Sequence, residues 1–318
     1  MSVPTPLAPP QRWPVPATAF SQQPYRAAYF AYWIASLPFL VLLWVLQWSL
    51  HLHPHSFLFS LSESLYARGI HRGMTLAARA AFFPDLVRLG DRPGELSPDA
   101  LNEASRFERT RVQWVPPPAE AGKWFAGHAV KEGCEPERIG AVVWGKPGRG
   151  PPREDLAVGP NETVFLHLHG GGLVMGNATE KYFINQFAAE IIECDAVDHV
   201  LSPEYRQLDQ GPWPLPLVDC ITAYAYLVDT LKVAPSRILV GGDSAGGLLA
   251  LALLRYLRDD LQAELPRAAL LVSPLANVSR WLGPKLQLQP SPSRHIDLLN
   301  IEAVSCLLPS DLYPLVLH

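Results

Sequence analysis

The glycine-rich stretch at residues 241–247 constrains the fold of this chain more than any other. It reads Gly241-Gly242-Asp243-Ser244-Ala245-Gly246-Gly247 and lies between apolar runs at 238–240 and 248–254. This pattern predicts a strand, a tight turn and a helix. A serine on such a turn is strained, its hydroxyl is exposed above the sheet edge, and glycines beside it avoid collisions with neighbouring elements. Ser244 in this Gly-x-Ser-x-Gly pattern is therefore a candidate nucleophile.

A second glycine motif lies upstream. Residues 163–172 read Thr-Val-Phe-Leu-His-Leu-His-Gly-Gly-Gly, a strand-like run followed by a glycine triplet. Such a triplet exposes backbone N–H groups that can hold a developing oxyanion together with the N–H of the residue after the nucleophile. A flexible loop would explain the triplet alone. Both motifs in this order, each directly after a strand-like run, favour a hydrolytic site.

These residues resemble the hormone-sensitive-lipase-like branch of the α/β-hydrolases, which carries His-Gly-Gly-Gly upstream of Gly-Asp-Ser-Ala-Gly. The resemblance spans roughly residues 110–280. It includes Leu201-Ser202-Pro203-Glu204 and Ser273-Pro274, whereas His199-Val200 replaces the Tyr-Arg that is usual in the family. The resemblance implies a carboxylic-ester hydrolase that forms an acyl-enzyme on Ser244. It also implies that Gly171, Gly172 and Ala245 donate the oxyanion-hole N–H groups, without metal or cofactor.

The sequence offers no acid and base in the positions where the family places the other two members of its catalytic triad. In the family the chain order is serine, then carboxylate, then histidine, and both partners come later than the 74 residues after Ser244 allow. Asp297 follows His295, which is the wrong order, and Asp311 precedes His318, the last residue. Residues 313–317 read instead as a seventh strand. We therefore expect a chain lacking acid and base, and the alternative function is a catalytically dead homologue or fragment.

Composition excludes several other classes of protein. The net charge of −4 gives no argument for nucleic-acid binding, and a hydrophobic fraction of 48% is ample for a core. The four cysteines fit no zinc pattern, and buried free thiols are favoured over disulfides. No dinucleotide fingerprint is present. The expected partners are a small lipophilic ester and a membrane.

The N-terminal region predicts a membrane anchor. Residues 1–26 read as a disordered proline-rich tail, and residues 27–50 hold no charged side chain. As a helix these 24 residues would reach about 36 Å, enough to cross a bilayer. A buried helix and a cleaved signal peptide are the alternatives. Residues 51–109 are expected to be a linker and cap-like helices, whose arginines would form a cap, a membrane collar or a solvated face.

Two signals favour a catalytic domain in the lumen of the endoplasmic reticulum. Arg12 and Arg26 precede the apolar segment, and basic residues mark the cytoplasmic side. Three glycosylation sequons begin at Asn161, Asn177 and Asn277, although a glycan at Asn177 would lie close to the glycine triplet. This layout resembles that of the membrane-anchored arylacetamide and steryl deacetylases, which makes lipid, sterol or xenobiotic esters the expected substrates.

Strands and helices alternate from about residue 110, so residues 110–318 are expected to form one α/β-hydrolase domain, incomplete at its C-terminus. The alternation predicts a mostly parallel sheet with helices on both faces. Ligands of such sheets bind at the carboxyl ends of the strands. The predicted strands are 112–115, 141–144, 163–168, 197–201, 238–240 and 268–272. The predicted helices are 181–193, one over about 217–228, and one directly after Ser244.

Overall fold

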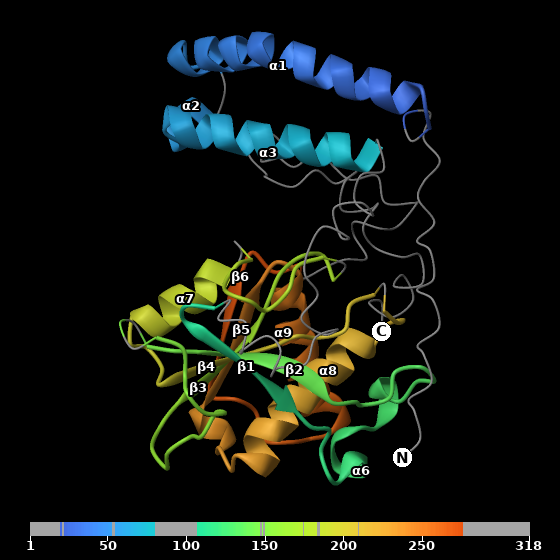
Figure 1. Ribbon diagram of the computed structural model, residues 1–318, viewed down its shortest axis with the longest axis vertical. Helices are drawn as coiled ribbons and strands as arrows, with labels where there is room; N and C mark the ends of the chain where they lie inside the picture. Colours follow the sequence, from blue (N-terminus) through green and yellow to red (C-terminus); the bar gives the residue numbers. More distant parts are fainter. Residues whose placement is uncertain are drawn as a thin grey trace. The chain divides into compact units, whose positions relative to one another are not determined.

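A computed structural model describes residue 20, residues 22–52 and 55–79, and residues 107–275 except 147, 149, 174, 183, 184 and 209. The described residues fall into an N-terminal helical unit and a larger α/β unit, and each is described by itself (Figure 1). The predicted seventh strand lies outside the described residues, as do nearly all of the proline-rich tail, Cys306 and the candidate triad partners His295, Asp297, Asp311 and His318.

The α/β unit is built on a six-stranded sheet with the order β1-β2-β4-β3-β5-β6. Its strands are β1 (Thr110–Val115), β2 (Ile139–Trp144), β3 (Val164–Leu168), β4 (His199–Pro203), β5 (Ile238–Asp243) and β6 (Ala268–Val272). β2 is antiparallel to both of its neighbours, whereas β4, β3, β5 and β6 are mutually parallel. This confirms the predicted, mostly parallel α/β sheet.

Helices cover both faces of the sheet (Figure 1). On one face lie α8 (Leu215–Ala225) and α9 (Ala245–Arg255), which pack on the alternate side chains Val164, Leu166 and Leu168 of β3, and the short α6 (Ala121–Trp124) packs against α8. On the other face α7 (Gln186–Glu193) packs through Ala188, Ala189 and Ile192. Short 3-10 turns, η3 (Gly127–Ala129) and η6 (Pro235–Arg237), join these elements. Because successive side chains of β3 point to opposite faces of the sheet, β3 contributes to two separate hydrophobic cores.

Helices α8 and α9 both end in a wider π-helical turn, η5 (Tyr226–Thr230) and η7 (Tyr256–Asp260). The first residue of each turn is a buried tyrosine whose hydroxyl reaches a distant segment. Tyr226 accepts a hydrogen bond from the Gln113 amide of β1 at 3.1 Å. The Tyr256 hydroxyl is 2.9 Å from the Ala126 carbonyl oxygen and 2.8 Å from the Ala126 backbone nitrogen, and so fixes the segment after α6.

Among the predicted boundaries that differ from the structure, three are explained by named contacts. The helix predicted at 181–193 begins only at Gln186, because the buried Asn185 amide donates to the carbonyl oxygens of Asn177 and Thr179. The strand predicted at 197–201 is shifted to His199–Pro203, since residues 201–203 pair with β2. β5 continues through both glycines to Asp243, so the turn itself is confined to Ser244.

The N-terminal unit is an antiparallel pair of long helices, α1 (Tyr25–Ser49) and α3 (Leu61–Arg79), joined through the short α2 (His55–Leu58). Arg72 donates to the Trp33 carbonyl oxygen at 3.0 Å and the Ser36 hydroxyl at 2.6 Å, near the middle of α1. Arg68 donates to the Gln47 side chain at 2.8 Å. Arginines of α3 thus pack along one side of α1. The sequence alone did not decide whether these arginines form a cap, a membrane collar or a solvated face.

The three cysteines that the structure describes are free thiols. Cys134 and Cys220 are buried, as predicted, and burial raises the pKa of both thiols. Cys194 is exposed, because it follows the last turn of α7, so the prediction of buried thiols is wrong for this residue.

Candidate active site

Ser244 lies in a single-residue turn between β5 and α9. Its backbone is in a left-handed conformation with φ of 51°, which costs a non-glycine residue free energy and persists only where the surroundings enforce it. Those surroundings are explicit. The Ser244 N–H donates to the Val272 carbonyl of β6 at 2.9 Å, and its own carbonyl accepts from the N–H groups of Leu248 and Leu275, both at 3.1 Å. The strained turn that the sequence predicts is therefore present.

Glycines flank this turn because the end of β3 passes close to it. A Cβ atom on Gly242 would lie 2.1 Å from the Leu168 carbonyl oxygen, and one on Gly246 would lie 1.9 Å from the same atom. Both distances are far below any van der Waals contact. The glycines of the Gly-x-Ser-x-Gly pattern are thus required by the close approach of β3 to the turn, as expected for the strand–turn–helix geometry that presents a nucleophilic serine.

The glycine triplet and the serine turn meet at one edge of the sheet. β3 pairs in parallel with β5, with Leu168 opposite Gly242, so the residues after both strands emerge side by side. The Gly170 N–H donates to the Asp243 carboxylate at 3.1 Å. Gly171 and Gly172 have φ values of 126° and 67°, conformations that favour glycine. Ser244 and the triplet are therefore neighbours.

The predicted oxyanion donors lie in suitable backbone positions. Ala245 is the first residue of α9, and the first N–H groups of a helix have no acceptor within it. Gly171 and Gly172 follow the residue whose N–H is bound by Asp243. Their assignment as donors stays a prediction, because a donor is defined by its distance to a reacting oxygen.

Both histidines of β3 and its end are buried. The ring of His169 stacks on Tyr205 with centroids 4.2 Å apart, and its Nδ1 is 2.8 Å from the Gly170 carbonyl oxygen. Burial lowers the pKa of His169 to about 4 and that of His167 to about 3. His167 Nδ1 lies 2.9 Å from the Ser202 hydroxyl. His167 is thus a core residue, and His169 supports the glycine loop.

We expect these two buried histidines to make the fold acid-sensitive. Their folded pKa values lie below the ordinary 6.5, so the unfolded chain binds more protons and stability falls as pH drops below about 6.5. Between pH 7 and pH 6 each histidine should lower the free energy of unfolding by about 0.7 kcal/mol. Urea unfolding at both pH values measures this loss. The variant His167→Gln should show about half of the pH dependence, and an unchanged dependence would contradict the assignment.

Asp243 ties the serine turn to the glycine loop. Its half-buried carboxylate, whose pKa burial raises, accepts the Gly170 N–H. Removing that acceptor in Asp243→Ala should slow reaction of Ser244 with a fluorophosphonate about tenfold, the equivalent of one charge-assisted hydrogen bond. Asp243→Asn retains an acceptor oxygen and should react nearly normally. Asp195→Ala, which removes an exposed carboxylate elsewhere in the unit, is the control.

Sequence reasoning missed two tyrosines and an arginine that support this edge of the sheet. Tyr205 donates to the His169 carbonyl at 2.7 Å. Tyr182 lies where a Cβ on Gly176 would be, and burial together with the nearby Asp243 raises its pKa to about 12. Arg206, itself partly exposed, forms an ion pair with the fully buried carboxylate of Asp219 at 2.7 Å. The sequence signal that could have indicated Tyr205 and Arg206 is the run Glu204-Tyr205-Arg206, which directly follows the Leu-Ser-Pro segment shared with the family.

Comparison with known proteins agrees with this geometry. Residues 165–305 match a family model described as the alpha/beta hydrolase fold. The chain is 30% identical over 214 residues to an ethyl acetate hydrolase of Pseudomonas putida, covering 65% of this chain and 63% of the relative. It is 38% identical over 109 residues to neutral cholesterol ester hydrolase 1 of Rattus norvegicus, covering 33% and 26%. It is 35% identical over 106 residues to arylacetamide deacetylase-like 3 of Homo sapiens, covering 32% and 25%. The chain thus matches less than two thirds of the length of each relative.

Proposed function

Because this chain carries an α/β-hydrolase domain of the hormone-sensitive-lipase-like kind, we propose that it is a serine carboxylic-ester hydrolase acting on lipophilic esters. One observation carries the proposal: the strained Ser244 turn and the glycine loop meet at the carboxyl ends of two neighbouring parallel strands. That edge is where sheets of this kind bind their ligands. Relatives named as ester hydrolases, and one named as deacetylase-like, indicate the class of substrate.

In the proposed reaction the Ser244 hydroxyl attacks the acyl carbon of the ester. The N–H groups of Gly171, Gly172 and Ala245 stabilise the oxyanion that forms, and the alcohol leaves. Water then hydrolyses the acyl-enzyme and regenerates Ser244. A general base must accept the serine proton. The two histidines nearest to this edge among the described residues are buried and bound to other groups, so the base is proposed to come from outside the described residues.

A fluorophosphonate probe tests this proposal, since it reacts with an activated serine. We expect the full chain, solubilised in detergent, to be labelled at Ser244 and the Ser244→Ala variant to remain unlabelled. Ser236→Ala removes an exposed serine before β5 and should be labelled like the unaltered chain. Absence of labelling in the unaltered chain would instead support the catalytically dead homologue. Labelling that persists in Ser244→Ala would exclude Ser244 as the nucleophile.

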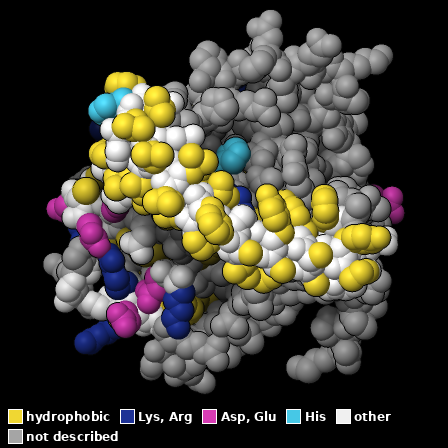
Figure 2. Space-filling model, turned by 90° about the horizontal axis from the view of Figure 1, so that it is seen from above, with side chains coloured by type: hydrophobic (Ala, Val, Ile, Leu, Met, Phe, Trp, Pro, Cys, Tyr) yellow, Lys and Arg dark blue, Asp and Glu magenta, His cyan; other side chains and the backbone are white. Residues whose placement is uncertain are grey.

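We also propose that α1 anchors the protein in a membrane as a single crossing. α1 is one helix of 25 residues, long and apolar enough to cross a bilayer, and its most apolar window is not buried in the unit. Large apolar side chains are exposed along its length, among them Tyr32, Phe39, Leu42 and Leu46 (Figure 2). These observations favour the membrane over the alternative of a buried core helix.

The arginines of α3 set a condition on this crossing. Arg72 contacts the middle of α1, and a charged side chain at the centre of a bilayer costs about 2.5–3.5 kcal/mol or more. α3 also contains Glu63, His71 and Arg68. When α1 crosses the bilayer, α3 is therefore proposed to leave it and lie on the lipid surface with its basic side chains among the headgroups.

The catalytic unit is proposed to lie in the lumen of the endoplasmic reticulum. Arg12 precedes α1 and Arg26 lies in its first turn, and both favour a cytoplasmic N-terminus. The sequons of the chain are compatible with this orientation, because lumenal segments meet the glycosylation machinery. A protease-protection experiment on intact microsomes tests it, and the same preparation serves the next proposal.

A further inference from the structure

A sequon at the amino end of β3 occupies an exposed turn. It consists of Asn161, Glu162 and Thr163, and the Asn161 side chain is exposed to solvent. β3 then runs from Val164 to Leu168 before the glycine loop begins. At about 3.3 Å per residue this places Asn161 some 15–20 Å from the edge that carries Ser244. A large group on Asn161 would therefore not obstruct the candidate active site.

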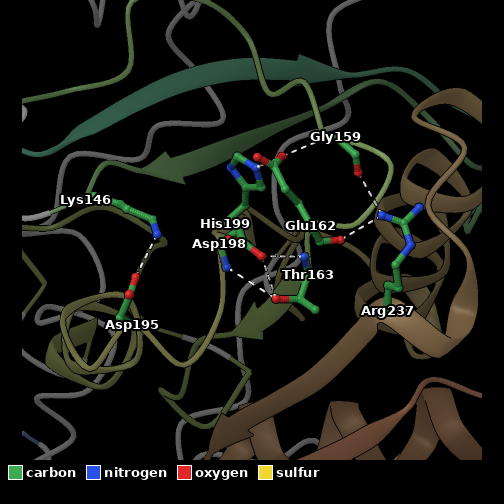
Figure 3. A network of polar contacts seen from close by, with 8 residues as sticks. All are labelled: Lys146, Gly159, Glu162, Thr163, Asp195, Asp198, His199 and Arg237. Atoms are coloured by element: carbon green, nitrogen blue, oxygen red, sulfur yellow. Dashed lines mark hydrogen bonds and ion pairs between the residues drawn. The ribbon is translucent and has the colours of Figure 1, made fainter.

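The neighbours of Asn161 are held in place by polar contacts (Figure 3). The Glu162 carboxylate accepts the Gly159 N–H at 2.6 Å and contacts His199 at 2.7 Å. Arg237 donates to the carbonyl oxygens of Gly159 and Glu162, both at 2.8 Å. Thr163 donates through its N–H and its hydroxyl to Asp198. The turn is thus fixed on both sides of Asn161, which is left facing solvent.

The second sequon, at Asn177, lies in a different environment. The Asn177 side-chain oxygen accepts from the N–H and hydroxyl of Thr179 at 3.0 and 2.6 Å. Ala178 is fully buried, and its N–H donates to Glu204 at 2.6 Å. The Asn177 carbonyl accepts from the buried amide of Asn185 at 2.8 Å. A glycan at Asn177 would have to fit into this packed loop directly after the glycine triplet.

We infer that Asn161 carries an N-linked oligosaccharide in the folded protein and that Asn177 does not. This inference rests on the proposed lumenal location. The transfer forms a bond between the Asn161 Nδ2 atom and the first sugar carbon, breaks the bond of that carbon to a lipid diphosphate, and releases one amide proton. Because the folded protein engages the Thr163 hydroxyl with Asp198, the oligosaccharide is attached before β3 joins the sheet, and a chain that received one at Asn177 could not pack this loop and would not reach the folded state.

The experiment expresses the full chain, with a C-terminal epitope, in cells that have an endoplasmic reticulum. Asn277→Gln serves as the background, since that sequon lies outside the described residues. We expect one step of mobility to be lost on treatment with peptide-N-glycosidase. Asn161→Gln should abolish this step, whereas Asn177→Gln should leave it unchanged. Thr163→Ser keeps the sequon and should keep the glycan, which separates loss of the acceptor from a folding defect.

Two readouts distinguish failure of the glycan from failure of the location. Protease added to intact microsomes should leave the epitope protected. Protection without a mobility step would overturn the glycan inference alone. Digestion of the epitope would overturn the lumenal location and the glycan with it. A glycan found by mass spectrometry on Asn177 in the protease-resistant, folded fraction would contradict the contrast between the two sequons.

Discussion

Replacing Gly246 by alanine should prevent the α/β unit from folding stably. The added Cβ would lie 1.9 Å from the Leu168 carbonyl oxygen and 2.8 Å from that of His169, and Leu168 cannot move without disturbing the pairing of β3 with β5. Overpacking a core usually costs about 1–3 kcal/mol. A collision with backbone on this scale should cost about 4 kcal/mol or more, a large share of the stability of a typical domain.

The measurement is urea unfolding of the detergent-solubilised chain, with limited proteolysis for a variant that does not fold. Gly122→Ala is the matched control, because a Cβ there would meet nothing within 4 Å and its helix, α6, belongs to the same unit. This control should be neutral or stabilising by up to about 1 kcal/mol, since alanine favours helix over glycine. Equal stability of the two variants would show that β3 does not approach the serine turn as described.

Replacing Asp219 by alanine should have the second largest effect. Its carboxylate is fully buried and accepts from the Arg206 N–H at 2.7 Å and from the Arg206 guanidinium at 2.7 and 3.0 Å. Removing one partner of a buried ion pair typically costs about 3–5 kcal/mol, and the remaining pair of Arg206 with the exposed Glu137 at 3.3 Å places the loss at the lower end of this range. We expect the free energy of unfolding to fall by this amount.

Two further variants separate charge from shape at this position. Asp219→Asn keeps an acceptor for the Arg206 N–H and should lose less stability than Asp219→Ala. Asp259→Ala removes an exposed carboxylate that pairs with Arg258, and such surface pairs contribute about 0–1 kcal/mol. A loss in Asp219→Ala no larger than that in Asp259→Ala would mean that the segment after β4 is held by other contacts.

The meeting of the serine turn and the glycine loop at one edge of the sheet could be predicted from sequence, because glycines mark positions where the backbone needs a conformation or a close approach that other residues do not allow. The two motifs each follow a strand, and parallel strands emerge at one edge, so Ser244 and the loop after His169 had to be near each other. The contact of Gly170 with Asp243 could not be predicted, because it depends on the register of β3 against β5. No periodic pattern encodes that register.

The starts of α7 and β4 could not be predicted for a related reason. The apolar pattern of residues 181–193 fits a helix from its first residue, but the buried amide of Asn185 binds the carbonyl oxygens of Asn177 and Thr179, and α7 begins only at Gln186. Polar contacts between distant segments override the local pattern. The packing of Arg68 and Arg72 against an uncharged helix is of the same kind, since the sequence shows the arginines and not their partners.

The π-helical turns at the ends of α8 and α9 connect late segments of the α/β unit to its first segments. Each turn accommodates one more residue than an α-helical turn, which rotates the helix face and directs a tyrosine toward the beginning of the unit. Through Tyr226 and Tyr256, late segments of the unit fasten β1 and the connection that follows it. A break in the backbone between β1 and β2 would therefore leave both pieces attached. This part of the unit should tolerate new chain ends between β1 and β2 better than the deletion of one residue from either π-helical turn.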